Sequence, residues 1–188
     1  MRTRSPSQLL HALDSPDPAT KYAASKALRQ ASESDARQLL PYVDRFVSML
    51  SEENSFLRWD ATRVVGHLAA FATDEAAECA LDSIVAQIRG PQMIGAATAM
   101  AALSDIAVAT PRLADRVSRA ILGVRTAEYK TPECRNVAIG HAIQSFGRFV
   151  HLVSDPEAVL GFVREQLDNP RRATRESGEV LEAARRAR

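Results

Sequence analysis

A pattern of small and aliphatic residues that recurs about every 38 positions is the feature that most constrains the fold of this chain. Each copy ends in a small or β-branched residue followed by an aliphatic residue, and successive copies are spaced by 37, 38, 40 and 38 residues. The position four before each aliphatic residue is mostly small, and the position three after it is apolar, so these positions share one helix face. A repeat of this length is one helical unit that buries its core only by stacking on its neighbours. The aliphatic residues are Leu28, Val65, Leu103, Ile143 and, in a weaker fifth copy, Leu181.

A second amphipathic stretch lies between each pair of these helices, as in residues 43–50 and 81–88. Helix starts are marked by a capping side chain before a proline, at Thr110, Thr131, Asp155 and Asn169, because proline suits the first helical turn. Repeated helix starts without strand signals indicate stacked helical hairpins. We therefore predict an all-α fold of about five hairpins that forms a single domain over residues 1–188.

Two segments carry a family resemblance. Residues 13–24 and 43–61 each run from an apolar helix through a turn rich in Pro, Asp or Asn to an aliphatic or aromatic residue, a basic residue and an Ala. This pattern resembles the HEAT repeat of the armadillo-like α-solenoid family, with Lys21 and Arg58 at the basic position. The third to fifth copies carry Ala96, Asn136 and Thr174 there and depart from the motif. The resemblance implies a right-handed superhelix in which one helix of each pair lines a concave face.

Composition limits the class of partner. The chain holds 24 basic and 23 acidic residues, and its net charge of +1 argues against a diffuse electrostatic partner such as bulk nucleic acid. Two distant cysteines, Cys79 and Cys134, make no disulfide framework and favour a reducing compartment. The longest uncharged stretch, residues 90–104, is shorter than the roughly 20 residues of a bilayer span. We expect a cytoplasmic monomer without membrane association.

Residues that often carry chemistry are scattered. None of the four histidines has a second His at helical spacing or a following Glu, so we expect no metal and no cofactor; the histidines are His11, His67, His141 and His151. Some HEAT-like hydroxylases hold iron with His-Glu dyads, which this sequence lacks. Neither cysteine has a nearby His on its helix face, so we favour packing or mild reactivity over catalysis for Cys79 and Cys134.

The single tryptophan, Trp59, is followed by Asp60. Some HEAT-like proteins are DNA glycosylases that use Trp and Asp on the concave face. Adjacent helix positions point about 100° apart, so these two side chains do not converge as a pair. We predict that Trp59 packs between the first and second repeats.

The arginines of the fourth repeat form the main candidate binding set. Arg112, Arg116 and Arg119 form a stripe on a helix that we expect to be an inner one, and Arg125 follows it. The preceding helix, also expected to be inner, carries an acidic stripe of Glu75, Glu78 and Asp82. Ion pairing between the two stripes is the favoured interpretation. The alternative is a binding patch for an acidic peptide, a phosphate or a nucleic-acid backbone, formed by Arg112, Arg116, Arg119 and Arg125.

The pattern as a whole favours a non-catalytic protein-interaction scaffold or adaptor whose inner helices bind a protein partner. A nucleic-acid-binding protein is the first alternative, in which Lys130 and Arg135 would extend the arginine patch. A HEAT-like enzyme, such as a DNA glycosylase or a chromophore lyase, is the second, and it would require a concave pocket with converging polar side chains.

Overall fold

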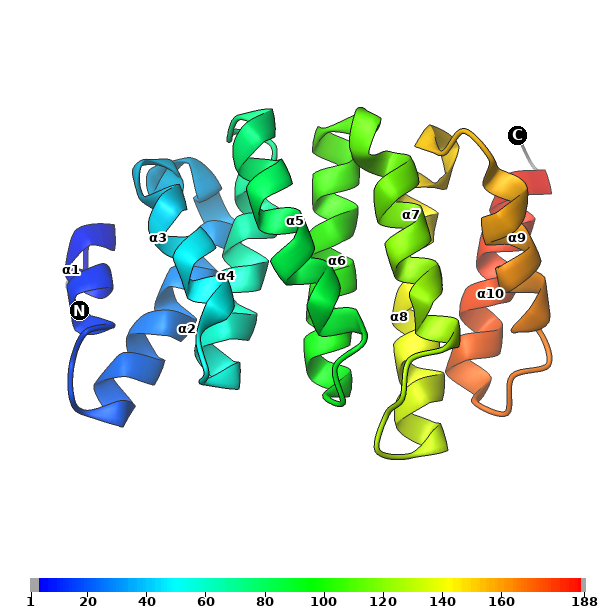
Figure 1. Cartoon of the computed structure of the whole chain (residues 1–188), viewed down its shortest axis with the longest axis horizontal. Coiled ribbons are helices and arrows are strands. Elements are labelled where there is room, and N and C mark those ends of the chain that lie inside the picture. The colour runs from blue at the N-terminus through cyan, green and yellow to red at the C-terminus, as the bar shows by residue number, and fades with distance from the viewer. Residues whose placement is uncertain (1–3, 187–188) are drawn as a thin grey trace.

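The computed structural model describes residues 4–186 and consists of five consecutive helix pairs (Figure 1). The pairs are α1 (Pro6–Ala12) with α2 (Pro18–Asp35), α3 (Val43–Ser48) with α4 (Ser55–Leu68), α5 (Asp74–Ile88) with α6 (Met93–Ala109), α7 (Ala114–Leu122) with α8 (Pro132–Phe149), and α9 (Pro156–Glu165) with α10 (Arg172–Arg186). Short 3-10 helices extend several of them: η1 (Ala36–Tyr42), η2 (Met49–Ser51), η3 (Pro111–Leu113), η4 (Gly123–Arg125) and η5 (Val150–Leu152). Residues 4–186 contain no β-strand.

The five predicted repeats are confirmed, and their aliphatic residues occupy equivalent places. Each lies on the second helix of its pair and is buried. One continuous hydrophobic core runs through the stack from Leu9 to Leu181. The residues at the equivalent places are Leu28, Val65, Leu103, Ile143 and Leu181.

Capping side chains begin most of the helices, as the sequence predicts. The Thr131 side chain accepts a hydrogen bond from the backbone N–H of Cys134 at the start of α8. The Asp155 side chain accepts one from the backbone N–H of Glu157 at the start of α9. Thr110 is different: its side chain does not cap the following helix, and its hydroxyl lies 3.4 Å from a carboxylate oxygen of Asp74 in the first turn of α5. Thr110 therefore stands between the end of α6 and the start of η3 and contacts α5.

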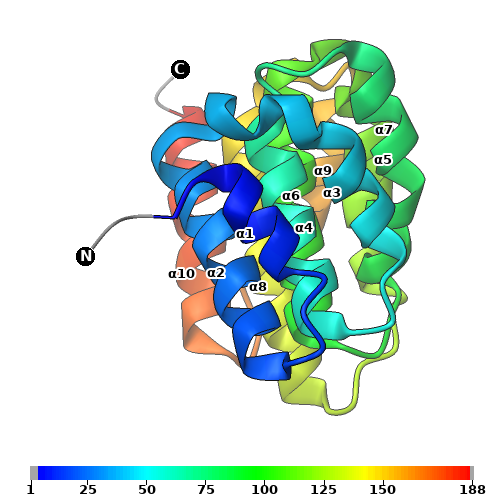
Figure 2. The same cartoon turned by 90° about the vertical axis from the view of Figure 1, so that its left-hand side faces the viewer.

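The helices form two layers that curve into a shallow arc (Figure 2). We call α2, α4, α6, α8 and α10 the inner layer, because they line the concave side, and α1, α3, α5, α7 and α9 the outer layer. The prediction that residues 75–88 and 111–124 form inner helices is wrong, because these segments are α5 and η3–α7–η4 of the outer layer. Neighbouring helices of the inner layer approach one another more closely than those of the outer layer, and glycine lies at two of the closest contacts.

Two glycine contacts show this close approach between inner helices. A Cβ atom added at Gly66 on α4 would lie 2.8 Å from the Cα of Ala102 on α6. A Cβ at Gly140 on α8 would lie 2.9 Å from the Oγ1 of Thr174 on α10. Real Cβ atoms do not come this near to other atoms, so the inner layer depends on glycine at these positions.

Arginine side chains donate hydrogen bonds to the backbone of the loops that precede two inner helices. Arg58 of α4 donates to the backbone carbonyls of Glu52 and Glu53. Arg175 of α10 makes the same contact with the carbonyls of Asn169, at 2.6 Å, and Pro170. The fifth repeat therefore keeps the role of the basic residue but carries it one position later than the sequence motif.

None of the helices in residues 4–186 combines the length with the apolar character that crossing a bilayer requires.

Candidate interaction surface

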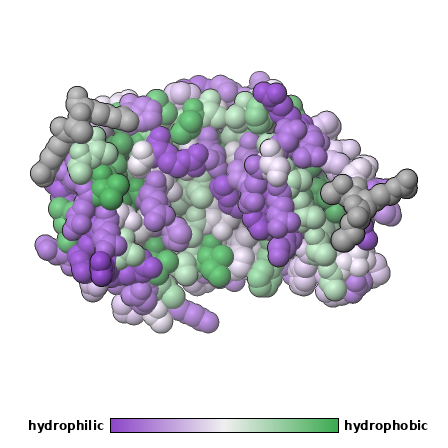
Figure 3. Space-filling model, turned by 180° about the vertical axis from the view of Figure 1, so that it is seen from behind, coloured by the Kyte–Doolittle hydropathy of each residue, from purple (hydrophilic) through white to green (hydrophobic). Residues whose placement is uncertain are grey.

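Exposed hydrophobic side chains are distributed unequally between the two layers. Six large hydrophobic side chains are exposed among the described residues, and each lies on an inner helix or on the turn that ends α4. The outer layer exposes none of this kind within residues 4–186. Figure 3 views the inner face, where hydrophobic side chains are exposed between bands of hydrophilic ones. The six are Tyr22, Phe56, Phe71, Ile94, Val108 and Val180.

Four side chains at the N-terminal ends of the inner helices form a group that we call the aromatic ledge: Tyr22, Phe56, Trp59 and Ile94. The ring centroids of Tyr22 and Phe56 are 6.0 Å apart, and those of Phe56 and Trp59 are 5.4 Å apart, both edge-to-face. The amide of Asn54 donates to the Tyr22 hydroxyl at 2.7 Å and fixes the first ring. The ledge therefore joins α2, α4 and α6 with a preformed apolar surface.

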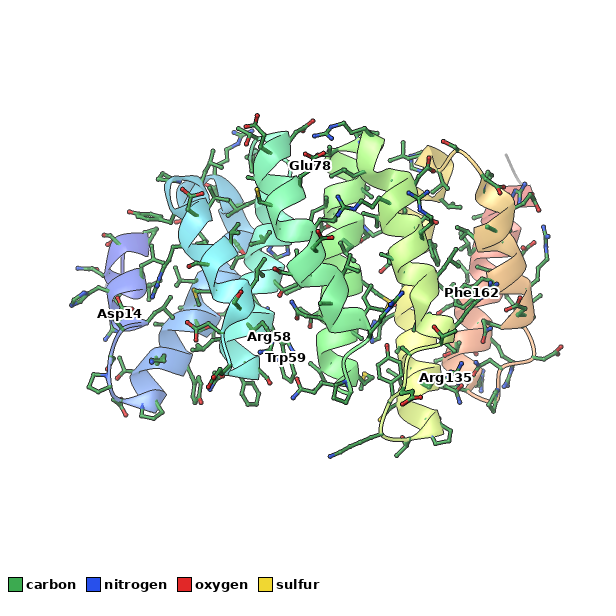
Figure 4. All side chains as sticks on the ribbon, viewed as in Figure 1. Asp14, Arg58, Trp59, Glu78, Arg135 and Phe162 are labelled. Carbon is green, nitrogen blue, oxygen red and sulfur yellow. The ribbon has the colours of Figure 1, made fainter. Side chains whose placement is uncertain are left out.

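Trp59 and Asp60 point to opposite neighbours. Trp59 lies beside Arg58 near the start of α4 (Figure 4), and its indole nitrogen lies 2.8 Å from the position that a Cβ atom of Gly95 on α6 would take. The prediction that Trp59 packs between the first two repeats is thus wrong, since its indole contacts the third. Asp60 instead accepts hydrogen bonds from Ser25 and Arg29 on α2, at 2.8 and 2.9 Å. The predicted divergence of the two side chains is confirmed, and they form no joint pocket.

Arginine–carboxylate pairs connect neighbouring inner helices, and we call them the inner ladder. Arg29 on α2 pairs with Asp60 on α4 at 2.9 Å. Arg63 on α4 and Arg148 on α8 both pair with Asp105 on α6, at 3.0 and 2.6 Å to its two different oxygens. Asp105 is only 14% exposed, so this carboxylate is held largely away from water between two guanidinium groups.

His67 extends the inner ladder toward the C-terminal end of α4. Its Nδ1 lies 2.8 Å from the hydroxyl of Ser32, and its Nε2 lies 2.6 Å from a guanidinium nitrogen of Arg63. Burial, followed by the charge of Arg63, lowers the pKa of His67 below its ordinary value. The imidazole is therefore held neutral as part of the hydrogen-bond network.

A groove of about 530 Å³ opens beside the ladder, at the C-terminal ends of α2, α4 and α6. Its lining brings polar groups together with exposed apolar side chains. Among the lining residues are His67, Asp105 and Arg148 from the ladder, and Phe71 and Val108 from the exposed set.

The predicted arginine stripe belongs to the outer layer, where most of its members are paired. Arg112 pairs with Asp74 at 2.8 Å and with Glu78, and Arg116 pairs with Asp82 at 2.6 Å. The favoured interpretation, pairing with the stripe on the preceding helix, therefore describes these two arginines. Asp74 takes the place expected of Glu75, because Arg112 lies in η3, ahead of α7, and reaches the first turn of α5.

The other two members of the predicted binding set, Arg119 and Arg125, take no part in the ion pairs with α5. Arg119 makes no ion pair within residues 4–186, and its charge contributes to lowering the pKa of Asp115, after the hydrogen bonds from Ser154. Arg125 pairs with Glu165 at 3.0 Å and lies 5.1 Å from the ring centroid of Phe162. Three of the four arginines thus pair with carboxylates of neighbouring helices.

Within residues 4–186, no three His, Cys, Asp or Glu side chains are grouped closely enough to hold a metal ion. Cys79 is exposed on α5, and Cys134 is half-buried in the first turn of α8; both are free thiols.

The inner ladder and the aromatic ledge were not predicted from the sequence. The ladder residues stand at different distances from the aliphatic residue of their own repeat: Arg29 follows Leu28 directly, Arg63 precedes Val65 by two positions, and Asp105 follows Leu103 by two. A repeat alignment therefore shows no common charged position. The paired side chains meet only because they point toward one another from neighbouring helices.

Comparison with known proteins bears on the fold. No protein-family model matches the chain, and no curated protein matches it by sequence. Solved structures do match. A designed armadillo repeat protein in complex with the peptide (KR)4 aligns with a TM-score of 0.65, at 14% identity over 95% of this chain and 80% of that one. The chain has an armadillo-like α-solenoid fold. A crystal structure of an engineered protein from the Northeast Structural Genomics Consortium aligns with a TM-score of 0.64, at 17% identity over 94% of this chain and 77% of that one.

Proposed function

We propose that this α-solenoid is a non-catalytic protein-interaction module that binds a protein partner on its inner face. The observation that carries the proposal is the unequal distribution of large exposed hydrophobic side chains: the six found in residues 4–186 all lie on the inner layer or its edge. Exposed apolar groups rimmed by polar ones mark interaction surfaces, and aromatic residues are enriched where partners bind.

The rigidity of the inner face supports the same proposal. The aromatic ledge is fixed by edge-to-face contacts, and the ladder holds Arg63 and Arg148 on one carboxylate. A preformed surface loses little conformational freedom on binding, which favours affinity. The designed armadillo repeat protein of similar fold is described in complex with the peptide (KR)4, which supports the proposal of a binding role.

The predicted binding set of Arg112, Arg116, Arg119 and Arg125 provides a second surface to compare. Arg112, Arg116 and Arg125 already bond to carboxylates of neighbouring helices, so a ligand there would have to compete with those ion pairs. Apolar contacts on the inner face would form without breaking any ion pair. We therefore favour the inner face over the arginine stripe as the primary surface.

The test compares one variant on each surface. Phe56→Ser removes the most exposed ring of the ledge, and Arg119→Glu changes the outer stripe, while neither side chain is part of the core. Wild-type chain and both variants are immobilised, and bound proteins and nucleic acids from the native cell extract are quantified. We expect a bound protein that Phe56→Ser loses and Arg119→Glu retains. Retention by Phe56→Ser with loss by Arg119→Glu would reject the inner face.

A further inference from the structure

We infer that the C-terminal end of α2, together with η1, is a pH-sensitive gate that opens away from α4 when His67 takes up a second proton. The gate consists of residues 30–42, and its residues 32–37 form one wall of the groove of about 530 Å³. Opening the gate therefore widens this groove. The inference concerns movement within the fold and does not depend on the proposed function.

Polar contacts attach α2 to α4 at two levels. Near the middle of α2, Ser25 and Arg29 both donate to Asp60, at 2.8 and 2.9 Å. Further along, the hydroxyl of Ser32 lies 2.8 Å from Nδ1 of His67. Within residues 4–186, the gate makes no other hydrogen bond to α4. The polar attachment of the gate to α4 thus depends on the state of one imidazole.

His67 lies between Ser32 of the gate and Arg63 of its own helix. Its Nε2 lies 2.6 Å from a guanidinium nitrogen of Arg63, which can only donate, so Nε2 accepts and Nδ1 carries the proton. A proton added at Nε2 would bring two donors and two positive charges together at this distance. Either the guanidinium group or the imidazole must then move.

The guanidinium group of Arg63 is the more firmly held of the two. It bonds at 3.0 Å to Asp105 of α6, a carboxylate that is only 14% exposed and that Arg148 of α8 also bonds, at 2.6 Å. The ring of His67 has no polar partner within residues 4–186 besides Arg63 and Ser32. The ring therefore moves, and because the ring is rigid, its contact with Ser32 is broken as well.

The charges that face His67 determine where the imidazolium goes. Arg63 and Arg29 disfavour the charged ring, whereas Asp105 and Glu33 favour it. Asp105 already bonds two guanidinium groups, but Glu33 lines the groove with a side chain that is 47% exposed. The imidazolium therefore leaves the space between α2 and α4 for the groove, where Glu33 and water stabilise it. The other charged side chains that line the groove are Asp35 and Arg37 of the gate and Arg148 of α8.

Burial, followed by the charge of Arg63, holds the pKa of His67 below 6.5, so the gate opens only at acidic pH. The test is hydrogen–deuterium exchange with mass spectrometry on the full chain between pH 8 and pH 5. Each rate is divided by that of the urea-unfolded chain at the same pH. We expect residues 30–42 to exchange at least about fivefold faster at pH 5 than at pH 8, whereas residues 18–29 and α6 should change by less than about twofold.

Three variants, each checked for folding by circular dichroism, assign the response to His67. His67→Gln stays neutral while keeping a donor and an acceptor, and it should remove the pH response of the gate. His67→Lys carries a positive charge at pH 8, and there it should make the gate exchange at least about fivefold faster than in wild type. His141→Gln is the control, because the pKa of His141 is also lowered, and it should leave the response of the gate within about twofold.

Three results would overturn the inference. An equal rise in exchange in all five inner helices would show that acid weakens the whole chain and not the gate. A pH response that His67→Gln retains would assign the opening to another group. A folded His67→Lys chain whose gate exchanges at the wild-type rate would show that a positive charge at this position does not open it. If His67→Lys does not fold, the comparison of wild type with His67→Gln decides.

Discussion

A guanidinium nitrogen of Arg63 lies 2.6 Å from Nε2 of His67, one turn further along α4. An arginine can only donate hydrogen bonds, so Nε2 accepts and the imidazole proton is assigned to Nδ1. Nδ1 then donates to the hydroxyl of Ser32, which itself donates to the backbone carbonyl of Arg29 at 2.6 Å. The network is satisfied only while His67 is neutral, because a second proton would face the guanidinium group.

The free energy of unfolding should therefore decrease as pH is lowered, because His67 becomes protonated. Its pKa in the folded chain is below the ordinary value of 6.5, so the unfolded chain binds the proton first as pH decreases. The stabilisation is complete above pH 6.5 and is lost as pH falls from there to the lower folded pKa. Urea unfolding from pH 8 to pH 5 should show a steeper loss for wild type than for His67→Gln. Burial and the charge of Arg171 also lower the pKa of His141, so His141→Gln measures how much that residue contributes to the pH dependence. If the free energy of unfolding depends on pH equally in wild type and His67→Gln, His67 is not responsible for the loss.

Replacing Gly66 by Ala should push α4 and α6 apart. The added Cβ would lie 2.8 Å from the Cα of Ala102, and a backbone atom cannot move aside as a flexible side chain can. We expect a loss of about 1–3 kcal/mol in the free energy of unfolding, which is typical of overpacking a close contact. Chemical denaturation measures it.

The control for this variant is Gly161→Ala in α9. A Cβ at Gly161 meets no atom within 4 Å, and the residue lies inside a helix. Removing the freedom of glycine in the unfolded chain should stabilise this variant by about 0.4–1 kcal/mol. Equal effects of the two substitutions would show that the inner helices tolerate wider spacing.

The fold was predictable because the same buried position recurs in each repeat and requires an aliphatic residue. Leu28, Val65 and Leu103 all fill the same place between one helix pair and the next, so the repeat spacing of the sequence is the spacing of the stack. The assignment of layers was not predictable in this way. Both helices of a pair are amphipathic, and the side to which the arc closes depends on contacts such as that of Gly66 with Ala102, which involve different repeats.

The candidate surface was less predictable than the fold for a physical reason. The stripe of Arg112 and Arg116 was visible because its members share one helix face, and its pairing with the preceding acidic helix followed from charge alone. The inner ladder joins Arg63, Asp105 and Arg148 from three helices. Such a cluster carries no periodic signal within any one segment, so it emerges only when the helices are placed in space.

Two phenylalanines should separate stability from binding. Phe146 is fully buried against Phe149 and Phe162, with ring centroids 5.8 and 6.0 Å away, so Phe146→Ala should cost about 3–5 kcal/mol. Phe56 is 64% exposed, so Phe56→Ala should change stability by less than about 1 kcal/mol. Thermal unfolding and partner capture on the same preparations check both. A Phe56→Ala chain that unfolds as readily as Phe146→Ala would show that the ledge supports the fold and does not serve binding alone.

Removing the shared carboxylate at Asp105 should lower the stability of the chain. Asp105→Asn leaves Arg63 and Arg148 facing each other without a negative charge, and we expect a loss of about 1–3 kcal/mol because this carboxylate is largely buried. Asp82→Asn is the matched control, since Asp82 pairs with Arg116 but is 83% exposed, and it should change stability by less than about 1 kcal/mol. Urea unfolding of wild type and both variants measures the two changes. An Asp105→Asn chain as stable as Asp82→Asn would show that the shared carboxylate does not support the inner layer.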